Sequence, residues 1–269
     1  MDATSPAGSA GTTGAGRWST ASALARCLLA SNPGPMTLDG TNSYALAAPG
    51  SASVVLVDPG PLEEDHLVAL AASGTVELVL LTHHHLDHTA GSARLHALTG
   101  APVRAADPAF CLGGEPLAAG EWIEAAGLRI QVLATPGHTG DSLCFWLPGD
   151  GPAGAVLTGD TVLGRGSSII AHPDGNVADY LHSLSVLAGF TGAAGLPAHG
   201  PVLADVALAA QAYRTHRLER LDEVRAALAT LGPDASAQAA ADVVYADVPA
   251  ALRPAALASM AAQLEYLRR

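Results

Sequence analysis

The sequence contains no lysine, so all 13 of its basic residues are arginines, and 25 acidic residues outnumber them. We interpret the missing lysine as codon bias in a GC-rich genome. The net charge of −12 makes the chain repel phosphate backbones unless its arginines gather in one place. Aromatic residues are also scarce, at 4%, whereas 49% of residues are hydrophobic and only 14% are charged. This balance excludes a disordered chain and predicts a compact globular protein.

Cysteine is equally rare. Cys27, Cys111 and Cys144 form no CxxC pair and are odd in number, which favours small buried side chains over a disulfide framework. Residues 1–16 have neither a basic start nor an apolar stretch, so we predict a flexible tail over residues 1–20 and no signal peptide. No apolar run is long enough to span a bilayer. We therefore expect a cytoplasmic protein without membrane contacts.

Apolar segments of strand length alternate with segments of helical pattern, which favours an α/β fold. Several predicted strands stop at polar clusters, as residues 53–57 do at Asp58 and residues 76–81 do at a histidine-rich segment. Beyond Pro201 the pattern is almost entirely helical. Further strands are predicted at 102–105, 128–133, 143–147, 155–157 and 194–196. Helices are predicted at 63–72, 92–98, 177–187, 206–231, 235–245 and 254–267. We divide the chain into a catalytic domain over residues 21–214 and a small helical C-terminal domain over residues 215–269.

The segment THHHLDH, residues 82–88, places four histidines and an aspartate directly after a buried strand. Imidazole and carboxylate groups suit a borderline metal such as zinc. In an extended turn, His83 and His85 point to one side and can reach one ion, while Asp87 and His88 can face a neighbouring ion. An exposed polar loop is the alternative, but so many histidines between a strand and a helix are costly without a purpose. The segment therefore predicts a metal site.

Three further polar residues occupy the same kind of position, each at a turn that follows an apolar strand. They are His138 in PGHT, Asp160 in TGDT and His199 in PAHG. One such residue alone is usually a loop residue or a helix cap. Three of them, in this order after an HxHxDH segment, indicate a metal centre much more strongly. The histidine-rich donors favour zinc, with manganese and iron as alternatives.

With these motifs the chain resembles the metallo-β-lactamase superfamily from about Asp39 to Pro201. The resemblance implies a four-layer αββα sandwich, with metal ligands on loops along one edge of two sheets. It also implies two Zn²⁺ ions per chain, each held by three residues and both bridged by Asp160. The ligands implied for the first ion are His83, His85 and His138. Those implied for the second ion are Asp87, His88 and His199.

Two neighbouring residues receive different expectations from the same resemblance. Asp58 matches an aspartate that supports the histidine loop from behind the metal ligands. His84 falls at a variable position of the motif, and we expect it not to bind metal. The implied chemistry is attack by a metal-bound hydroxide, with Asp87 as the catalytic residue that orients it. No side-chain nucleophile is then required.

A more detailed resemblance is to the group that includes human β-lactamase-like protein 2, and to its actinobacterial members. The residues that carry it are LDGTNSY at 38–44, DTVLG at 160–164 and the helix DYLHSL at 179–184. The resemblance implies that residues 215–269 of this chain form a small helical, winged-helix-like domain. Its members include an endoribonuclease that acts on single-stranded RNA and thioesterases that act on carrier-bound acyl chains.

Three functions remain open on this basis. The first is a dinuclear metal-dependent hydrolase of an ester or thioester, with a small-molecule or carrier-bound acyl substrate. The second is an endoribonuclease with the same dimetal site, and the third is a non-catalytic module. The acidic charge favours the first, and the complete ligand set argues against the third. Antibiotic hydrolysis is disfavoured because it calls for an exported enzyme. A homodimer remains an open alternative.

Arginines along one predicted helix are the main argument for RNA as a partner. Arg214, Arg217, Arg220 and Arg225 lie within it, and two more arginines end the chain. A solvated helix face paired with neighbouring acids is the simpler interpretation.

Substrate contacts are predicted in the loop that follows Asp160 and in the next helix. Arg165 and His172 are candidates to meet an anionic group, and Tyr180 is a candidate to hydrogen-bond to it. Ordinary loop residues and a packed helix tyrosine are the alternative for these three.

Overall fold

Apolar strands from the first half of the chain pair into a six-stranded sheet in sequential order. The computed structural model describes residues 16–269. The strands are β1 (Trp18–Thr20), β2 (Ala25–Leu29), β3 (Asn42–Leu46), β4 (Ser53–Val57), β5 (Thr75–Leu80) and β6 (Val103–Arg104). The pairs from β1 to β4 are antiparallel, whereas β4–β5 and β5–β6 are parallel. The parallel pairs need crossovers, which α1 (Glu64–Ala71) and α3 (Ser92–Thr99) supply.

Strands from the second half form a five-stranded sheet of order β11-β10-β9-β8-β7. They are β7 (Trp122–Ala125), β8 (Leu128–Ala134), β9 (Leu143–Leu147), β10 (Ala155–Gly159) and β11 (Ala194–Pro197). Only β10 and β11 run parallel, and α4 (Val177–Leu187) connects them. A short 3-10 turn, η1 (Pro108–Phe110), lies between the two sheets in the chain.

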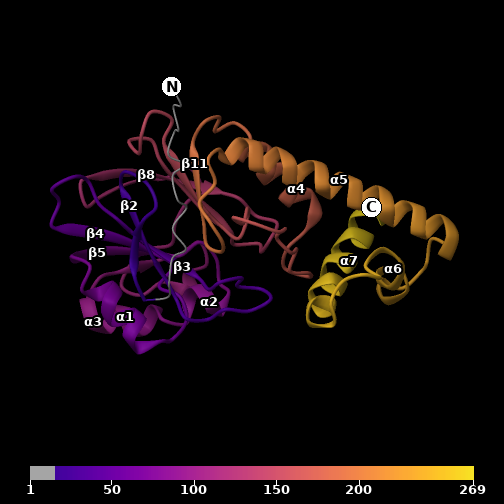
Figure 1. Ribbon diagram of the computed structural model, residues 1–269, viewed down its shortest axis with the longest axis horizontal. Helices are drawn as coiled ribbons and strands as arrows, with labels where there is room; N and C mark the ends of the chain where they lie inside the picture. The colour runs from indigo at the N-terminus through magenta and orange to yellow at the C-terminus, as the bar shows by residue number, and fades with distance from the viewer. Residues whose placement is uncertain (1–15) are drawn as a thin grey trace, which may run out of the picture.

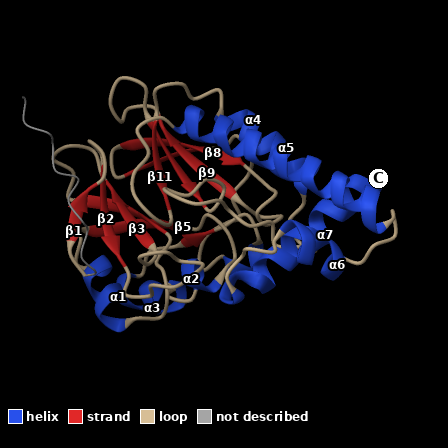
Figure 2. Cartoon of the chain, turned by 45° about the vertical axis from the view of Figure 1, so that its right-hand side comes forward, coloured by secondary structure: helices blue, strands red, loops and turns tan. Residues whose placement is uncertain are grey.

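Three apolar cores separate four layers, as the cartoon shows (Figures 1 and 2). The central core lies between the sheets and includes Phe145 and Leu46. A second core lies between the first sheet and α1 and α3, and a third lies between the second sheet and α4 and α5. This is the predicted αββα sandwich, and its fold class is confirmed.

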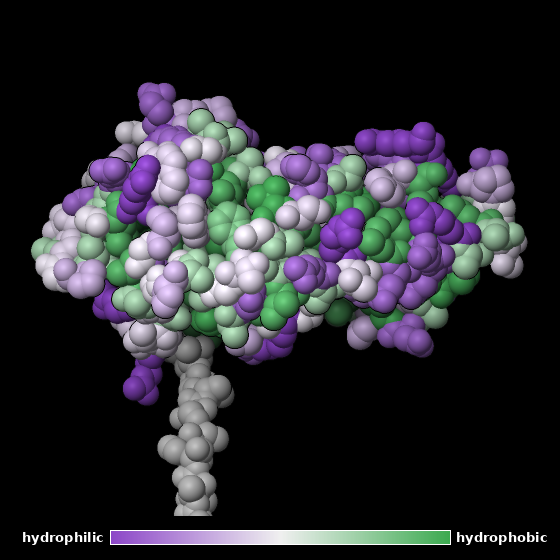
Figure 3. Space-filling view, turned by 90° about the horizontal axis from the view of Figure 1, so that it is seen from above, coloured by the Kyte–Doolittle hydropathy of each residue, from purple (hydrophilic) through white to green (hydrophobic). Residues whose placement is uncertain are grey.

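The C-terminal region is helical, as predicted. It consists of α5 (Val206–Leu231), α6 (Ala237–Val244), the 3-10 turn η2 (Ala250–Leu252) and α7 (Arg253–Arg268). Figure 1 shows α5 running from the sandwich out to the helices α6 and α7. A fourth apolar core, which includes Val224 and Met260, joins these helices. The face seen in Figure 3 mixes apolar and strongly hydrophilic side chains over this region.

Two boundaries and one feature of the C-terminal region differ from the prediction. The tail predicted over residues 1–20 is too long, because β1 pairs with β2 from Trp18 onward; its first fifteen residues lie outside the described part of the chain. The domain boundary predicted at residue 215 falls inside α5, which continues without a break. Residues 206–269, all of which are described, contain no strand, so they lack the wing of a winged helix. Within residues 16–269, no helix is long and apolar enough to cross a membrane.

Candidate metal centre

The predicted ligands lie at one edge of the sandwich, where strands of both sheets end. His83 and His85 follow β5, and Asp87 and His88 lie on the single helical turn α2 (Leu86–Thr89). The other three follow strands of the second sheet: His138 comes after β8, Asp160 after β10 and His199 after β11. The structure thus brings all seven predicted residues together.

Local backbone geometry explains how these loops approach so closely. Gly137 has a φ of +134°, and a side chain there would overlap the backbone of Tyr180 on α4. Only glycine therefore lets the loop before His138 lie against α4. Asp58, at the end of β4, also has a positive φ of 52°. That conformation turns its carboxylate toward Thr82 and His88 rather than along the strand.

The first set of side chains converges on one point. The Nε2 atom of His83 lies 3.0 Å from Nδ1 of His85, which lies 3.1 Å from Nε2 of His138. Oδ2 of Asp160 is 3.7 Å from Nε2 of His138. Four donor atoms within 4.8 Å of one another can surround a single metal ion.

The second set lies beside the first. Oδ2 of Asp87 is 3.4 Å from Nε2 of His88 and 3.2 Å from Nε2 of His199. The other oxygen of Asp160, Oδ1, is 3.3 Å from Nε2 of His199. Asp160 therefore presents one oxygen to each set, which is the arrangement expected of a bridging carboxylate.

Four of the five histidines are held by their outward nitrogens. Nδ1 of His88 bonds to Asp58 at 2.8 Å, and Nδ1 of His138 bonds to the Ile169 carbonyl at 2.8 Å. In the same way, Nδ1 of His199 bonds to the Gly40 carbonyl at 3.1 Å, and Nδ1 of His83 bonds to the Thr82 hydroxyl at 3.1 Å. Partners of this kind fix the ring orientation and keep Nε2 facing inward. Asp58 therefore lies where it was predicted, behind the histidines.

Buried polar atoms without partners test whether the site fits a metal. Nε2 of His88, Nε2 of His199 and Oδ1 of Asp160 are buried and have no hydrogen-bond partner among the described residues. Buried polar groups are nearly always satisfied, so three orphaned atoms that face one point indicate a missing ligand. Imidazole and carboxylate donors are those that zinc, manganese or iron accept. The residues fit divalent metal ions.

The histidines of the two ligand sets differ in their protonation. Burial, reinforced by neighbouring histidines, holds the pKa of His83 well below its usual value and lowers that of His85 to about 4. These rings are therefore neutral near pH 7 and have lone pairs to donate. In the second set burial opposes protonation, but the Asp160 carboxylate raises the pKa of His199 to about 9. A metal ion there must displace a proton, as ligands generally require.

His84 belongs to neither ligand set and turns toward Asp141. Its Nδ1 atom bonds to Asp141 at 2.8 Å, and its ring lies 6.0 Å from that of Phe110.

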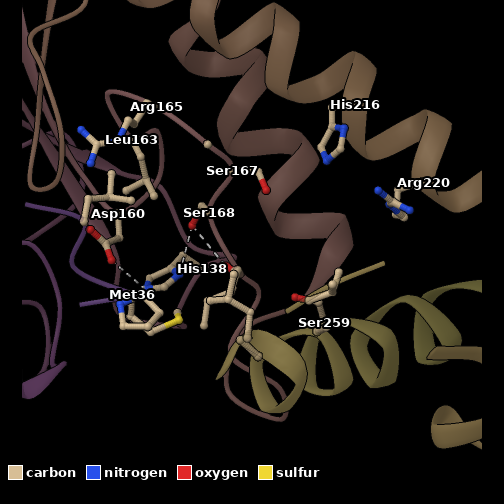
Figure 4. A pocket seen from close by; sticks show the side chains of 18 of the residues that line it. Met36, His138, Asp160, Leu163, Arg165, Ser167, Ser168, His216, Arg220 and Ser259 are labelled. Carbon is tan, nitrogen blue, oxygen red and sulfur yellow. Dashed lines mark hydrogen bonds and ion pairs between the residues drawn. The ribbon is translucent and has the colours of Figure 1, made fainter. Parts of the chain in front are cut away.

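A cleft of about 400 Å³ opens in front of the cluster, between the sandwich and the C-terminal helices. Figure 4 shows His138 and Asp160 at one end, His216 and Arg220 on α5, and Ser259 on α7. Much of its wall is apolar. The apolar side chains that line it include Met36, Leu38, Leu163, Val248, Leu252 and Ala256.

The three predicted substrate contacts fare differently. Arg165 lines the cleft, although it also forms an ion pair with Asp39. Tyr180 is fully buried and donates its hydroxyl to the Thr161 carbonyl at 2.7 Å, so its predicted substrate contact is wrong. His172 turns away from the cleft and pairs with Glu265 of α7 at 3.1 Å, so the prediction for it is also wrong.

Helices α5 and α7 hold the loop that follows Asp160, a role that was not predicted from the sequence. Tyr213 receives a hydrogen bond from the Leu163 amide at 3.1 Å, and Ser259 receives one from the Ile170 amide at 3.4 Å. Arg217 donates to the Ser168 carbonyl. No sequence motif indicates these contacts, because each joins residues that are far apart in the chain.

A two-sheet sandwich with a histidine- and aspartate-rich cluster at its edge defines a class of metal-dependent hydrolases. The metallo-beta-lactamase superfamily profile matches residues 36–199. The chain belongs to this superfamily, and membership implies divalent metal binding at the cluster.

Individual relatives agree with that membership. The chain is 32% identical to an atrochrysone carboxyl ACP thioesterase of Aspergillus chevalieri, over 75% of this chain and 64% of that protein. It is 30% identical to a beta-lactamase-like protein 2 homolog of Caenorhabditis elegans, over 89% of this chain and 82% of that one. A metallo-beta-lactamase family protein of Thermus thermophilus has a TM-score of 0.75 at 26% identity, covering 91% and 93% of the two chains. The chain spans 60% to 66% of the length of the first fungal relatives it matches.

Proposed function

We propose that this enzyme hydrolyses thioesters, or the related oxygen esters, with two divalent metal ions, preferably zinc. One ion is assigned to His83, His85 and His138, and the other to Asp87, His88 and His199, with Asp160 between them. Similarity to the nematode protein supports placement in the β-lactamase-like protein 2 group. We place the end of the catalytic part within α5, near residue 214, and assign residues 215–269 to the helices that wall the cleft.

The apolar lining of the cleft carries this proposal. Hydrophobic side chains, among them Met36 and Ala256, surround a space that leads to the metal cluster. Such a wall suits an acyl chain, because ligand pockets bury apolar groups and position them with a few polar ones. The similarity to a fungal thioesterase that is named for a carrier-bound substrate points the same way.

RNA remains the alternative substrate, and charge argues against it. Binding a nucleic-acid backbone requires cations that are free to pair with phosphates. Three arginines line the cleft, and Asp39 and Glu223 already pair with Arg165 and Arg220, which leaves Arg217 as a single cation for a backbone of several phosphates. The same pairing occurs between Arg225 and Asp222, as expected for a solvated helix face.

The residues of the site have separable roles in this hydrolysis. Bound metal ions would supply an activated water and polarise the carbonyl oxygen. The carboxyl of Asp87 is half-buried; the neighbouring His199 and His88 rings outweigh its burial and hold its pKa well below the usual range. It is therefore an ionised acceptor that can orient water. The apolar wall excludes bulk water from the reacting bond. The carbon–sulfur bond breaks, a carbon–oxygen bond forms, and the thiol leaves with a proton.

Metal-replete protein should release thiol from a neutral acyl pantetheine, followed with a thiol reagent. His83→Ala is the matched loss-of-metal control, and its rate should fall by at least about a hundredfold. The same preparation should leave single-stranded RNA uncut. Cleavage of RNA without thiol release would reject the proposal in favour of the endoribonuclease.

A further inference from the structure

Arg217 is a buried cation without an acidic partner. Its side chain lies on α5 and is only 5% exposed. None of the arginine ion pairs found among residues 16–269 includes it. The arginines that do form pairs are Arg94, Arg104, Arg165, Arg220, Arg225, Arg253 and Arg269. Among residues 16–269, Arg217 is the one arginine that is buried, and it has no acidic partner to compensate its charge.

Both contacts of the guanidinium within the described residues are to neutral groups. It donates from Nη2 to the Ser168 carbonyl, and its Cζ lies 5.3 Å from the centre of the Tyr180 ring. Nε is buried and has no acceptor in the described part of the chain. Arginine remains protonated, and therefore positively charged, even in such surroundings. A buried charge that is not paired costs several kcal/mol, so this residue is poised to bind an anion.

The position of Arg217 ties it to the metal centre and to the cleft. It is one of the residues that line the cleft. Ser168, whose carbonyl it contacts, places its own hydroxyl 3.2 Å from Nδ1 of His138. Arg220, one turn further along α5, also lines the cleft, but Glu223 and the Val244 carbonyl already occupy its guanidinium. An anion that enters the cleft therefore finds its free cation at Arg217.

We propose that Arg217 binds an oxyanion group of the substrate, so that the preferred thioester is anionic. The proposal rests on the proposed function. The group is a carboxylate on the acyl part or a phosphate on the thiol part, and both offer the paired oxygens that a guanidinium fork recognises. An anionic substrate would supply the negative charge that Arg217 does not receive from the described residues.

Matched thioesters separate the two sources of the anion. Butyryl-pantetheine and succinyl-pantetheine differ by one carboxylate on the acyl part. Butyryl-pantetheine and butyryl-phosphopantetheine differ by one phosphate on the thiol part. A charge-assisted hydrogen bond corresponds to a preference of about 10- to 100-fold in kcat/KM for one anionic substrate, seen mainly in KM.

Arg217→Gln removes the charge but keeps a donor for the Ser168 carbonyl. Its preference for the anionic thioester should fall to about twofold or less, because kcat/KM should fall more for the anionic substrate than for neutral butyryl-pantetheine. Arg225→Gln, on the same helix but exposed and paired with Asp222, is the matched control and should retain the full preference. Equal turnover of neutral and anionic thioesters by the wild type would overturn the proposal. So would an Arg217→Gln variant that slows all substrates alike, which is the signature of a purely positioning residue.

Two further measurements keep the proposal testable. If Arg217→Gln does not fold, Arg217→Lys serves instead, and losing the planar fork should cost at least about threefold of the preference. An unchanged preference would count against the proposal. In calorimetric titrations, a non-hydrolysable thioether that bears the preferred anion should bind Arg217→Gln at least about tenfold more weakly than it binds the wild type. Absence of all thioester hydrolysis would reject the proposed function alone, whereas equal thioether binding by wild type and variant would reject the anion site.

Discussion

Replacing Asp58 with asparagine should remove the second metal ion while leaving the fold intact. Asp58 is 2% exposed and accepts three hydrogen bonds, two from Thr82 at 2.8 and 2.7 Å and one from Nδ1 of His88 at 2.8 Å. Its positive φ is one that asparagine adopts readily. In the Asp58→Asn variant, the side-chain carbonyl could still accept from the Thr82 amide. The other oxygen becomes an amide nitrogen, which cannot accept a proton from His88.

The tautomer of His88 sets the size of the effect. Facing an amide donor, Nδ1 of His88 must become the acceptor, which places the ring proton on Nε2. That nitrogen is the atom that faces Asp87 and Asp160, at 3.4 and 3.7 Å. Losing such a supporting partner typically costs 10- to 100-fold in metal affinity, or about 1.4 to 2.7 kcal/mol. The metal-free protein keeps most of its contacts and should lose only about 1 kcal/mol of unfolding free energy.

Metal content after dialysis against a chelator, together with calorimetric titration, tests this reasoning. Wild type should retain two ions per chain, and Asp58→Asn should retain close to one. Asp141→Asn is the matched control, because Asp141 bonds to Nδ1 of His84 at the same 2.8 Å but lies outside the cluster. If Asp58→Asn binds both ions as tightly as the wild type, the histidine is not oriented by this carboxylate.

Three further outcomes follow from the same contacts. Asp160→Ala should lose most of both ions. Saturating metal, at a hundredfold excess over Kd, should raise the unfolding free energy of the wild type by about 3 kcal/mol per ion, as measured by urea unfolding with and without chelator. Gly137→Ala should cost more than about 3 kcal/mol, because its Cβ would overlap the Tyr180 backbone, whereas Gly120→Ala, with open space around it, should cost about 1 to 2 kcal/mol of left-handed strain. Burial lowers the pKa of His66 to about 4 from 6.5, so the stability it contributes is present above pH 6.5 and is lost as the pH falls toward 4. Wild type should then lose about 2 kcal/mol more than His66→Gln between pH 7.5 and pH 5, and equal pH profiles would contradict this burial effect.

The bounds of the long helices were predictable from the sequence because their apolar spacing is regular. α4 and α5 begin and end where the pattern predicted, at residues 177–187 and 206–231. β1, β2, β7 and the single turn α2 were not predicted, since segments of three to five residues carry little periodicity. The gathering of the cluster was predictable for a different reason: its residues lie in the segments that follow strands, and neighbouring strand ends meet at one edge.

The walls of the cleft were not predictable in the same way. Tyr180 lies at an apolar position of the α4 stripe, and this spacing correctly indicated burial rather than substrate contact. Nothing local marks Arg217 as buried, because the groups around it come from Ser168 and Tyr180, about 50 and 37 residues away. His172 turned out to meet Glu265, a residue 93 positions further along the chain.

Both ligand sets draw on both sheets, and this has a mechanical consequence. His83 and His85 extend from the first sheet, whereas His138 and Asp160 extend from the second. At the same edge, two backbone hydrogen bonds of 2.7 Å already join the sheets, from Asn42 to Ala198 and from Leu143 to Thr82. Metal ions would therefore act as cross-links between two sheets in a chain whose three cysteines are all free. Loss of metal should let the two sheets separate at this edge. Amide hydrogen exchange of Asn42 and Leu143, which donate the two bonds between the sheets, would then report metal occupancy directly.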